Sequence, residues 1–192
     1  MREIIEFILE AEKLKSVTRK VKPLGLDRYE NSAEHSWQLC MFALALARFA
    51  DTSIDLNRVI RMLLVHDIGE IDTGDTIAFA EGGCEERKAA ELAAVTRIFG
   101  LLPKGQGADL LALWREFAHG ETPEARFANA VDRAMPVLLN LNNNGQSWRE
   151  NGISFERVVR RIAPPIQAGC PAMWDYLEPL LEEARTKGLF GL

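Results

Sequence analysis

Residues 56–75, LNRVIRMLLVHDIGEIDTGD, fall into two parts of different character. The first part, LNRVIRMLLVH, is predicted to be a helix that starts after an N-cap at Asp55. It is apolar on nearly every side, so we expect it at the centre of the core. The second part, HDIGEIDTGD, holds two glycines and four acids, which makes regular helix unfavourable. The sequence therefore predicts a central helix that ends in a polar, acidic segment.

The rest of the chain also shows the apolar spacing of helices. Asn31 is a predicted N-cap with Glu34 at the capping-box position, and Thr122 is a predicted N-cap followed by a proline. Pro136 is expected to kink or shorten its helix. Further predicted helices cover residues 4–14, 32–50, 85–99, 108–118, 123–141, 155–162 and 172–187. No strand pattern or internal repeat is present, so we predict an all-α fold of seven or eight helices in a single domain over residues 1–192.

Two details of these helices carry expectations about packing. Trp37, Met41, Leu44 and Ala45 share one stripe of their helix, which we expect to be buried. Pro164 and Pro165 are expected to lie in the break between the last two helices, because proline removes a helical hydrogen bond.

Composition limits the classes of function. The 192 residues include 23 Lys and Arg against 28 Asp and Glu, a net charge of −5, which argues against binding to polymeric nucleic acid. The three cysteines lie far apart and form no CxxC pair, so neither disulfides nor a thiolate metal site is expected. No signal peptide and no apolar stretch long enough to cross a membrane is found, so we expect a cytoplasmic protein without a membrane partner.

Residues of the type that bind metals lie on three predicted helices. His35 is in the first turn of one, His66 and Asp67 end another, and Asp132 lies within a third. A mixed nitrogen and oxygen set suits Mn²⁺, Fe²⁺, Co²⁺ or Zn²⁺ better than Ca²⁺. Taken singly, each residue is more often explained as structural. Asp132 differs because its neighbours are apolar and its side chain is expected to diverge from that of Arg133 by roughly 100° on the helix.

The sequence segments around these residues resemble those of a known enzyme superfamily. ENSAEHSW at 30–37, HDIGEIDTGD at 66–75 and AVDRAMP at 130–136 together resemble the HD-domain superfamily of metal-dependent phosphohydrolases, in its branch of 5′-deoxynucleotidases. This resemblance implies a helical HD-domain bundle and one divalent transition metal, Mn, Co or Fe, with Zn and Mg also open. It assigns the metal to His35, His66, Asp67 and Asp132.

The resemblance also implies roles for residues near the metal. Glu70 and Asp75 are implied as the catalytic acid and base, in an order that the sequence leaves open. Arg19 matches the position that contacts substrate phosphate, for which a guanidinium is well suited. Lys20 stands where the related enzymes have a tryptophan that crowds the sugar, so selection against a ribose hydroxyl is in question.

The expected function is hydrolysis of nucleoside 5′-monophosphates, including deoxyribonucleotides, to nucleoside and phosphate. Two alternatives stay open. One is hydrolysis of another phosphoester, such as a nucleoside triphosphate or a cyclic nucleotide; the other is a non-catalytic, metal-stabilised nucleotide-binding module. A homodimer is expected as well, through the apolar residues of the last helix (Met173, Trp174, Tyr176, Leu177, Leu180 and Leu181).

Overall fold

The computed structural model describes residues 1–75 and 84–191, and within these ranges the fold is all-α, as predicted. There are ten α-helical segments in them, two of which have only four and five residues, together with two short 3₁₀ turns. The α-helices are α1 (Arg2–Ala11), α2 (Ser32–Leu46), α3 (Leu56–Val65), α4 (Glu70–Thr73), α5 (Cys84–Phe99), α6 (Lys104–His119), α7 (Pro123–Asn142), α8 (Gln146–Glu150), α9 (Phe155–Gly169) and α10 (Pro171–Thr186).

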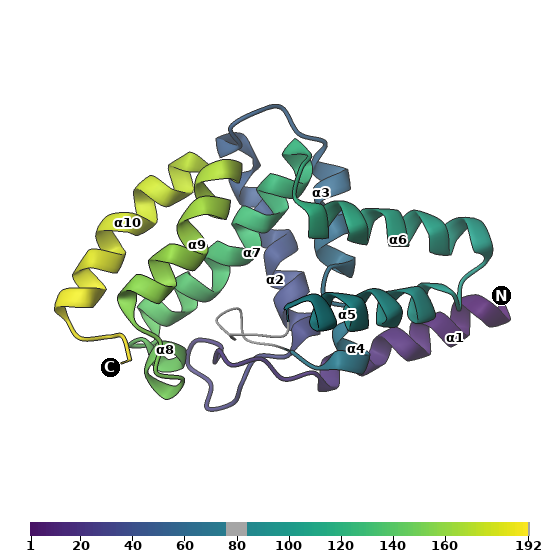
Figure 1. Ribbon diagram of the computed structural model, residues 1–192, viewed down its shortest axis with the longest axis horizontal. Helices are drawn as coiled ribbons and strands as arrows, with labels where there is room; N and C mark the ends of the chain where they lie inside the picture. Colours follow the sequence, from purple (N-terminus) through teal and green to yellow (C-terminus); the bar gives the residue numbers. More distant parts are fainter. Residues whose placement is uncertain (76–83, 192) are drawn as a thin grey trace.

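The helices form two groups that meet at the centre of the molecule. Figure 1 shows α7, α9 and α10 at one end, α1, α5 and α6 at the other, and α2 and α3 between them. The larger hydrophobic core lies among α2, α3, α7, α9 and α10, and a smaller one lies against α5 and α6. The end of α3 is where these two cores meet, since Val65 packs against both.

The predicted helix starts are confirmed. Asn31 caps α2, its side chain accepts from the backbone N–H of Glu34, and the Glu34 carboxylate accepts from the N–H of Asn31. Asp55 caps α3 and Thr122 caps α7, each with a side-chain oxygen that accepts backbone N–H groups. Short-range sequence signals therefore set where these three helices begin.

One expectation about proline was wrong. Helix α9 continues across Pro164 and Pro165 to Gly169. Helix α7 also continues past Pro136, to Asn142, close to its predicted end at residue 141. A proline within a helix costs about 3 kcal/mol. Burial of a whole helix face offsets that cost, because α9 buries Val158, Ile162 and Ile166 in the larger core.

The expected buried stripe of α2 was also wrong. Trp37, Met41 and Leu44 are exposed, with 64%, 51% and 52% of their surface accessible. The buried side of α2 instead carries His35, Ser36, Leu39, Cys40 and Ala43. Both sides of this helix contain apolar residues, so periodicity alone could not identify the inner one.

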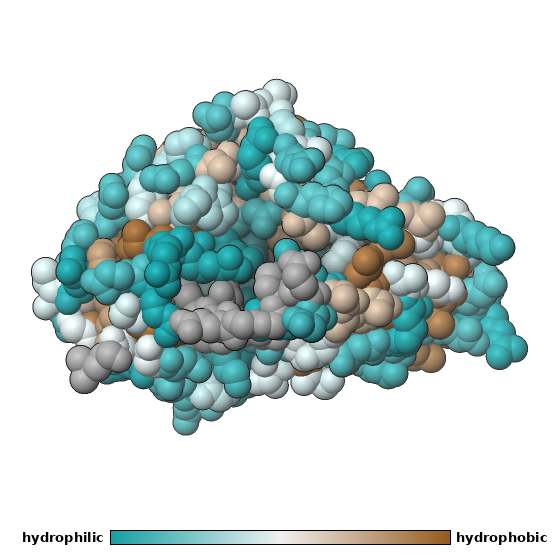
Figure 2. All heavy atoms as spheres, viewed as in Figure 1, coloured by the Kyte–Doolittle hydropathy of each residue, from teal (hydrophilic) through white to brown (hydrophobic). Residues whose placement is uncertain are grey.

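No helix in the described part of the chain is long and apolar enough to cross a membrane. Figure 2 shows a largely hydrophilic face with hydrophobic residues grouped over the end formed by α1, α5 and α6. Helix α1 contributes to the exposed apolar surface with Ile5, Ile8 and Leu9, each at least half exposed.

A close approach of α9 to α7 gives a test of this packing. Gly169 ends α9, and a Cβ atom there would lie 2.1 Å from the carbonyl oxygen of Arg126. We predict that Gly169→Ala lowers the free energy of unfolding by about 1–3 kcal/mol, since the helices must separate, and lowers Tm by roughly 3–10 °C. Calorimetry or circular dichroism measures this.

The matched control is Gly105→Ala in α6, where an added Cβ would meet no atom within 4 Å. We expect this variant to be as stable as the parent or slightly more stable, because alanine favours the helix. Equal melting temperatures for the two variants would contradict the packing argument.

Candidate metal centre

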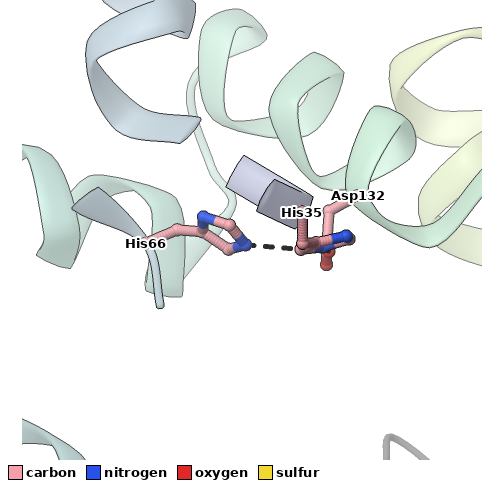
Figure 3. A group of neighbouring side chains, drawn as sticks. All are labelled: His35, His66 and Asp132. Carbon is pink, nitrogen blue, oxygen red and sulfur yellow. Dashed lines mark hydrogen bonds and ion pairs between the residues drawn. The ribbon is translucent and has the colours of Figure 1, made fainter. Parts of the chain in front are cut away.

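Three side chains from three helices converge in the interior. His35 lies in the first turn of α2, His66 directly follows α3, and Asp132 lies midway along α7. All three are buried, and one ligand atom from each lies within 4.8 Å of the others. Figure 3 shows the side chains turned toward one another. The structure thus brings together three of the four predicted metal ligands.

The ring of His66 is held by its surroundings. Its Nδ1–H donates to the carbonyl oxygen of Leu63 at 2.9 Å, and its ring packs edge-on against Phe117 with centroids 5.0 Å apart. The indole N–H of Trp114 donates to the backbone oxygen of His66 at 3.0 Å. These contacts leave Nε2 of His66 directed at the cluster, where it is buried and has no hydrogen-bond partner among the described residues.

Carboxylate oxygens surround this free nitrogen. Asp67 Oδ1 lies 3.1 Å and Asp132 Oδ1 3.8 Å from Nε2 of His66, while His35 Nε2 lies 3.1 Å from Asp132 Oδ1. A neutral imidazole lone pair that faces carboxylate oxygens is repelled unless a positive charge lies between them. The arrangement therefore requires a proton or a cation.

The electrostatics lead to the same conclusion. Burial lowers the pKa of His66, but the charges of Asp67 and Asp132 outweigh burial and raise it to about 9. Burial raises the pKa of Asp132, but Arg133 and the two imidazoles hold it well below its usual range. A buried cluster with this negative potential and these N and O donors fits a divalent cation of the first transition row.

Arg133 takes a larger part than expected. Its Nε lies 3.7 Å from Asp132 Oδ2, too long for a hydrogen bond but close enough to lower the pKa of that carboxyl. The arginine side chain is long enough to bend back along α7 toward its neighbour, which the angle between adjacent helix positions does not prevent.

Asp67 joins the cluster to Arg19. One oxygen of Asp67 faces His66, as described, and the other accepts from Nη1 of Arg19 at 2.9 Å. Burial raises the pKa of Asp67, but His66 and Arg19 outweigh it and lower the pKa to about 2. The predicted phosphate-binding arginine is thus paired directly with one of the four predicted metal ligands.

Glu70 and Asp75 lie beside this group. Ser32 Oγ, at the start of α2, donates to Glu70 Oε2 at 2.6 Å. Burial and the charge of Asp67 raise the pKa of Glu70 to about 8. Asp75 follows Gly74, whose φ of +72° favours glycine, and burial raises the pKa of Asp75 while Arg19 opposes that shift. Both acids therefore lie within electrostatic reach of Asp67 and Arg19.

Sequence reasoning missed two residues that the structure places at the site. Glu30 and Ser32 are buried at the site although neither was singled out; both lie within ENSAEHSW, the segment that carries His35. Asp72 instead forms a two-hydrogen-bond ion pair with Arg97, at 2.7 Å each, on the outer side of α4. His119 lies exposed at the end of α6.

Proteins of known sequence that are similar to this chain include 5′-deoxynucleotidases. The 5′-deoxynucleotidase HDDC2 of Xenopus laevis is 27% identical over 136 residues, which cover 68% of this chain and 66% of the relative. The Homo sapiens protein of the same name is 27% identical over 138 residues, 71% of this chain and 66% of the relative. The chain thus spans slightly less than two thirds of the length of these relatives.

A solved structure matches nearly the whole chain. It is described as a predicted metal-dependent phosphohydrolase from Magnetospirillum magnetotacticum MS-1, is 39% identical, and superposes with a TM-score of 0.93 over 99% of this chain and 95% of that one. The family model of the HD domain matches residues 11–174, which include all seven predicted site residues. The chain therefore belongs to the HD domain family and resembles its 5′-deoxynucleotidases.

Proposed function

We propose that this protein is a metal-dependent phosphomonoesterase that hydrolyses nucleoside 5′-monophosphates, deoxyribonucleotides among them. The observation that carries the proposal is the bridge made by Asp67. Asp67 contacts His66, which belongs to a buried cluster that needs a cation. It also contacts Arg19, whose guanidinium is suited to phosphate. One phosphate group could therefore contact both the cation and Arg19. The names of the relatives, 5′-deoxynucleotidase and metal-dependent phosphohydrolase, support the same reaction class.

The proposed metal ligands are His35, His66, Asp67 and Asp132. Their mixed imidazole and carboxylate donors favour Mn²⁺, Co²⁺ or Fe²⁺, with Zn²⁺ and Mg²⁺ also open. When bound, such an ion supplies Lewis-acid polarisation of the phosphoryl group and lowers the pKa of a water molecule.

The other side chains then have separate tasks. Arg19 binds phosphate oxygens; its Nε and Nη1 face Glu30 and Asp67. Glu70, with a raised pKa, can hold or release a proton near neutral pH, and Asp75 is the second candidate for proton transfer. Together they serve the attacking water and the leaving 5′ oxygen.

Substrate choice is tested directly. Purified protein is screened with Mn²⁺, Co²⁺ or Fe²⁺ against nucleoside monophosphates, triphosphates and cyclic nucleotides, and the released product is identified. Inorganic phosphate from monophosphates is expected. Release of pyrophosphate or tripolyphosphate, or the absence of turnover with any metal, contradicts the proposal. Comparing ribonucleotides with deoxyribonucleotides shows whether a protein with Lys20 at this position accepts the ribose 2′-hydroxyl.

We propose that the active form is a homodimer, but through a different face from the one expected. Most of the α10 residues named above are buried within the chain, as Trp174 and Leu177 illustrate with 6% and 0% exposure. The exposed row on α2, Trp37, Met41 and Leu44, is a better candidate for a two-fold contact. The cytoplasmic location and the single domain over residues 1–192 stay predictions of the sequence.

Removing Asp132 tests the metal ligands. Asp132→Ala is expected to reduce bound metal and abolish hydrolysis together, and added metal should raise the Tm of the parent but not of this variant. Elemental analysis and thermal shift measure both effects. Asp109→Ala, an exposed aspartate on α6, is the control and should keep metal and activity. A full equivalent of metal in Asp132→Ala would exclude Asp132 as a ligand.

Glu70→Gln separates proton transfer from metal binding. The variant should keep its metal but lose activity by about 10²–10⁴-fold. Asp72→Asn is the control, because Asp72 lies two residues away and pairs with Arg97 on the outer side of α4. This variant should lose little activity. In the parent, a base role makes the rate rise with pH through the Glu70 pKa, and an acid role makes it fall. Near-parental turnover of Glu70→Gln would remove Glu70 from the mechanism.

The dimer is tested by light scattering. We expect a mass of twice 21.5 kDa for the parent and 21.5 kDa for Met41→Glu, which places a charge on the exposed row of α2. Tyr176→Glu, at an exposed position of α10, should not change the mass. A parent that stays at 21.5 kDa at micromolar concentration would rule out the dimer.

A further inference from the structure

Glu30 is a buried carboxylate that neither the predicted metal set nor the proton-transfer pair uses. Only 2% of its surface is accessible. Its backbone is paired with the segment that carries Arg19: the Arg19 N–H donates to the Glu30 oxygen, and the Glu30 N–H donates to the Val21 oxygen, both at 2.8 Å. The isolated bridge between Thr18 and Asn31 belongs to the same pairing. This short hairpin places Glu30 and Arg19 together at the start of α2.

One oxygen of Glu30 faces both halves of the proposed site. Oε2 lies 3.3 Å from Nδ1 of His35 and 3.2 Å from Nε of Arg19. All three atoms are buried, and none has a well-aligned hydrogen bond to any described residue. A buried carboxylate is costly unless such groups compensate it, so the three atoms depend on one another.

The opposite nitrogen of His35 is the one directed at the cluster. Nε2 lies 3.1 Å from Asp132 Oδ1. For Nε2 to present a lone pair to a cation, the ring proton must be on Nδ1, where a carboxylate acceptor favours it and makes Nε2 a stronger donor. Glu30 Oε2 is the acceptor that the chain provides at that nitrogen.

We propose that Glu30 is a positioning residue that orients His35 for the metal and Arg19 for phosphate, and so couples the two halves of the site. The inference rests on the proposed function for its phosphate half only; the metal half requires just that a cation binds the cluster. A purely structural role would make Glu30 important for stability and irrelevant to the affinity for metal.

The test compares Glu30→Gln with Glu34→Gln in full-length protein. Glutamine keeps the size of Glu30 but removes its charge. Glu34, four residues later, pairs with Arg28 and the N-cap backbone and does not contact the cluster. Co²⁺ is titrated into each metal-free protein and followed by its visible absorption, which also reports a changed ligand field. Inorganic phosphate is then titrated into the Co²⁺-loaded proteins.

We expect Glu30→Gln to raise the Kd for Co²⁺ by about 10–100-fold and to alter the Co²⁺ spectrum. The Kd for phosphate should rise by about fivefold or more. Glu34→Gln should have the same Kd for Co²⁺ and for phosphate as the parent. Melting curves of the metal-free proteins should show that Glu30→Gln is folded.

A Co²⁺ affinity within threefold of the parent overturns the metal half, and an unchanged phosphate affinity overturns the phosphate half. Glu30→Ala, which removes the acceptor entirely, must weaken Co²⁺ binding at least as much as glutamine does. Because these titrations need no turnover, a protein that hydrolyses no nucleotide would refute the proposed function while the metal half is still decided.

Discussion

A charge buried where three helices meet is the constraint on which the rest of this structure depends. Asp132 lies on the inner side of α7 with only 7% of its surface exposed, and two imidazole rings are directed at it from α2 and α3. Burying a carboxylate without compensation costs several kcal/mol. The two hydrophobic cores enclose this polar centre on either side, and it is compensated by groups that themselves need a cation.

The order of residues 30–35 shows how a short segment organises such a centre. Asn31 caps α2, which places Glu30 before the helix and Ser32 and His35 within its first turn. Glu30 faces Arg19 and His35, while Ser32 donates to Glu70. One helix start therefore reaches the proposed metal ligand, phosphate contact and proton-transfer residue at once.

Helix packing determined the course of α9 and the buried side of α2, where the local sequence was unfavourable or ambiguous. Helix α9 continues across two adjacent prolines because its buried face packs along α7, with Gly169 allowing the backbones to come close. Helix α2 turns His35 and small residues inward and leaves Trp37 outside. The length of α9 and the inward side of α2 were therefore determined by the helices packed against them, rather than by their own composition.

The sequence by itself determined the all-α class, the starts of α2, α3 and α7, and the residue types that gather at the site. These depend on short-range chemistry: a capping side chain is at most three residues from the N–H group that it accepts, and apolar spacing repeats within a few turns. The sequence around His35, His66 and Asp132 also carried the family resemblance, which assigned Glu70, Asp75 and Arg19.

Only the tertiary structure decided which of these groups meet and what supports them. Asp67 reaches Arg19 across 48 positions of sequence, and His35 reaches Asp132 across 97. Glu30 went unnoticed because an acid before a helix cap is usually solvated, and its burial follows from a hairpin that no local pattern predicts. Contacts between distant segments depend on how all the helices pack together, and that information is spread over the whole chain rather than held in any one motif.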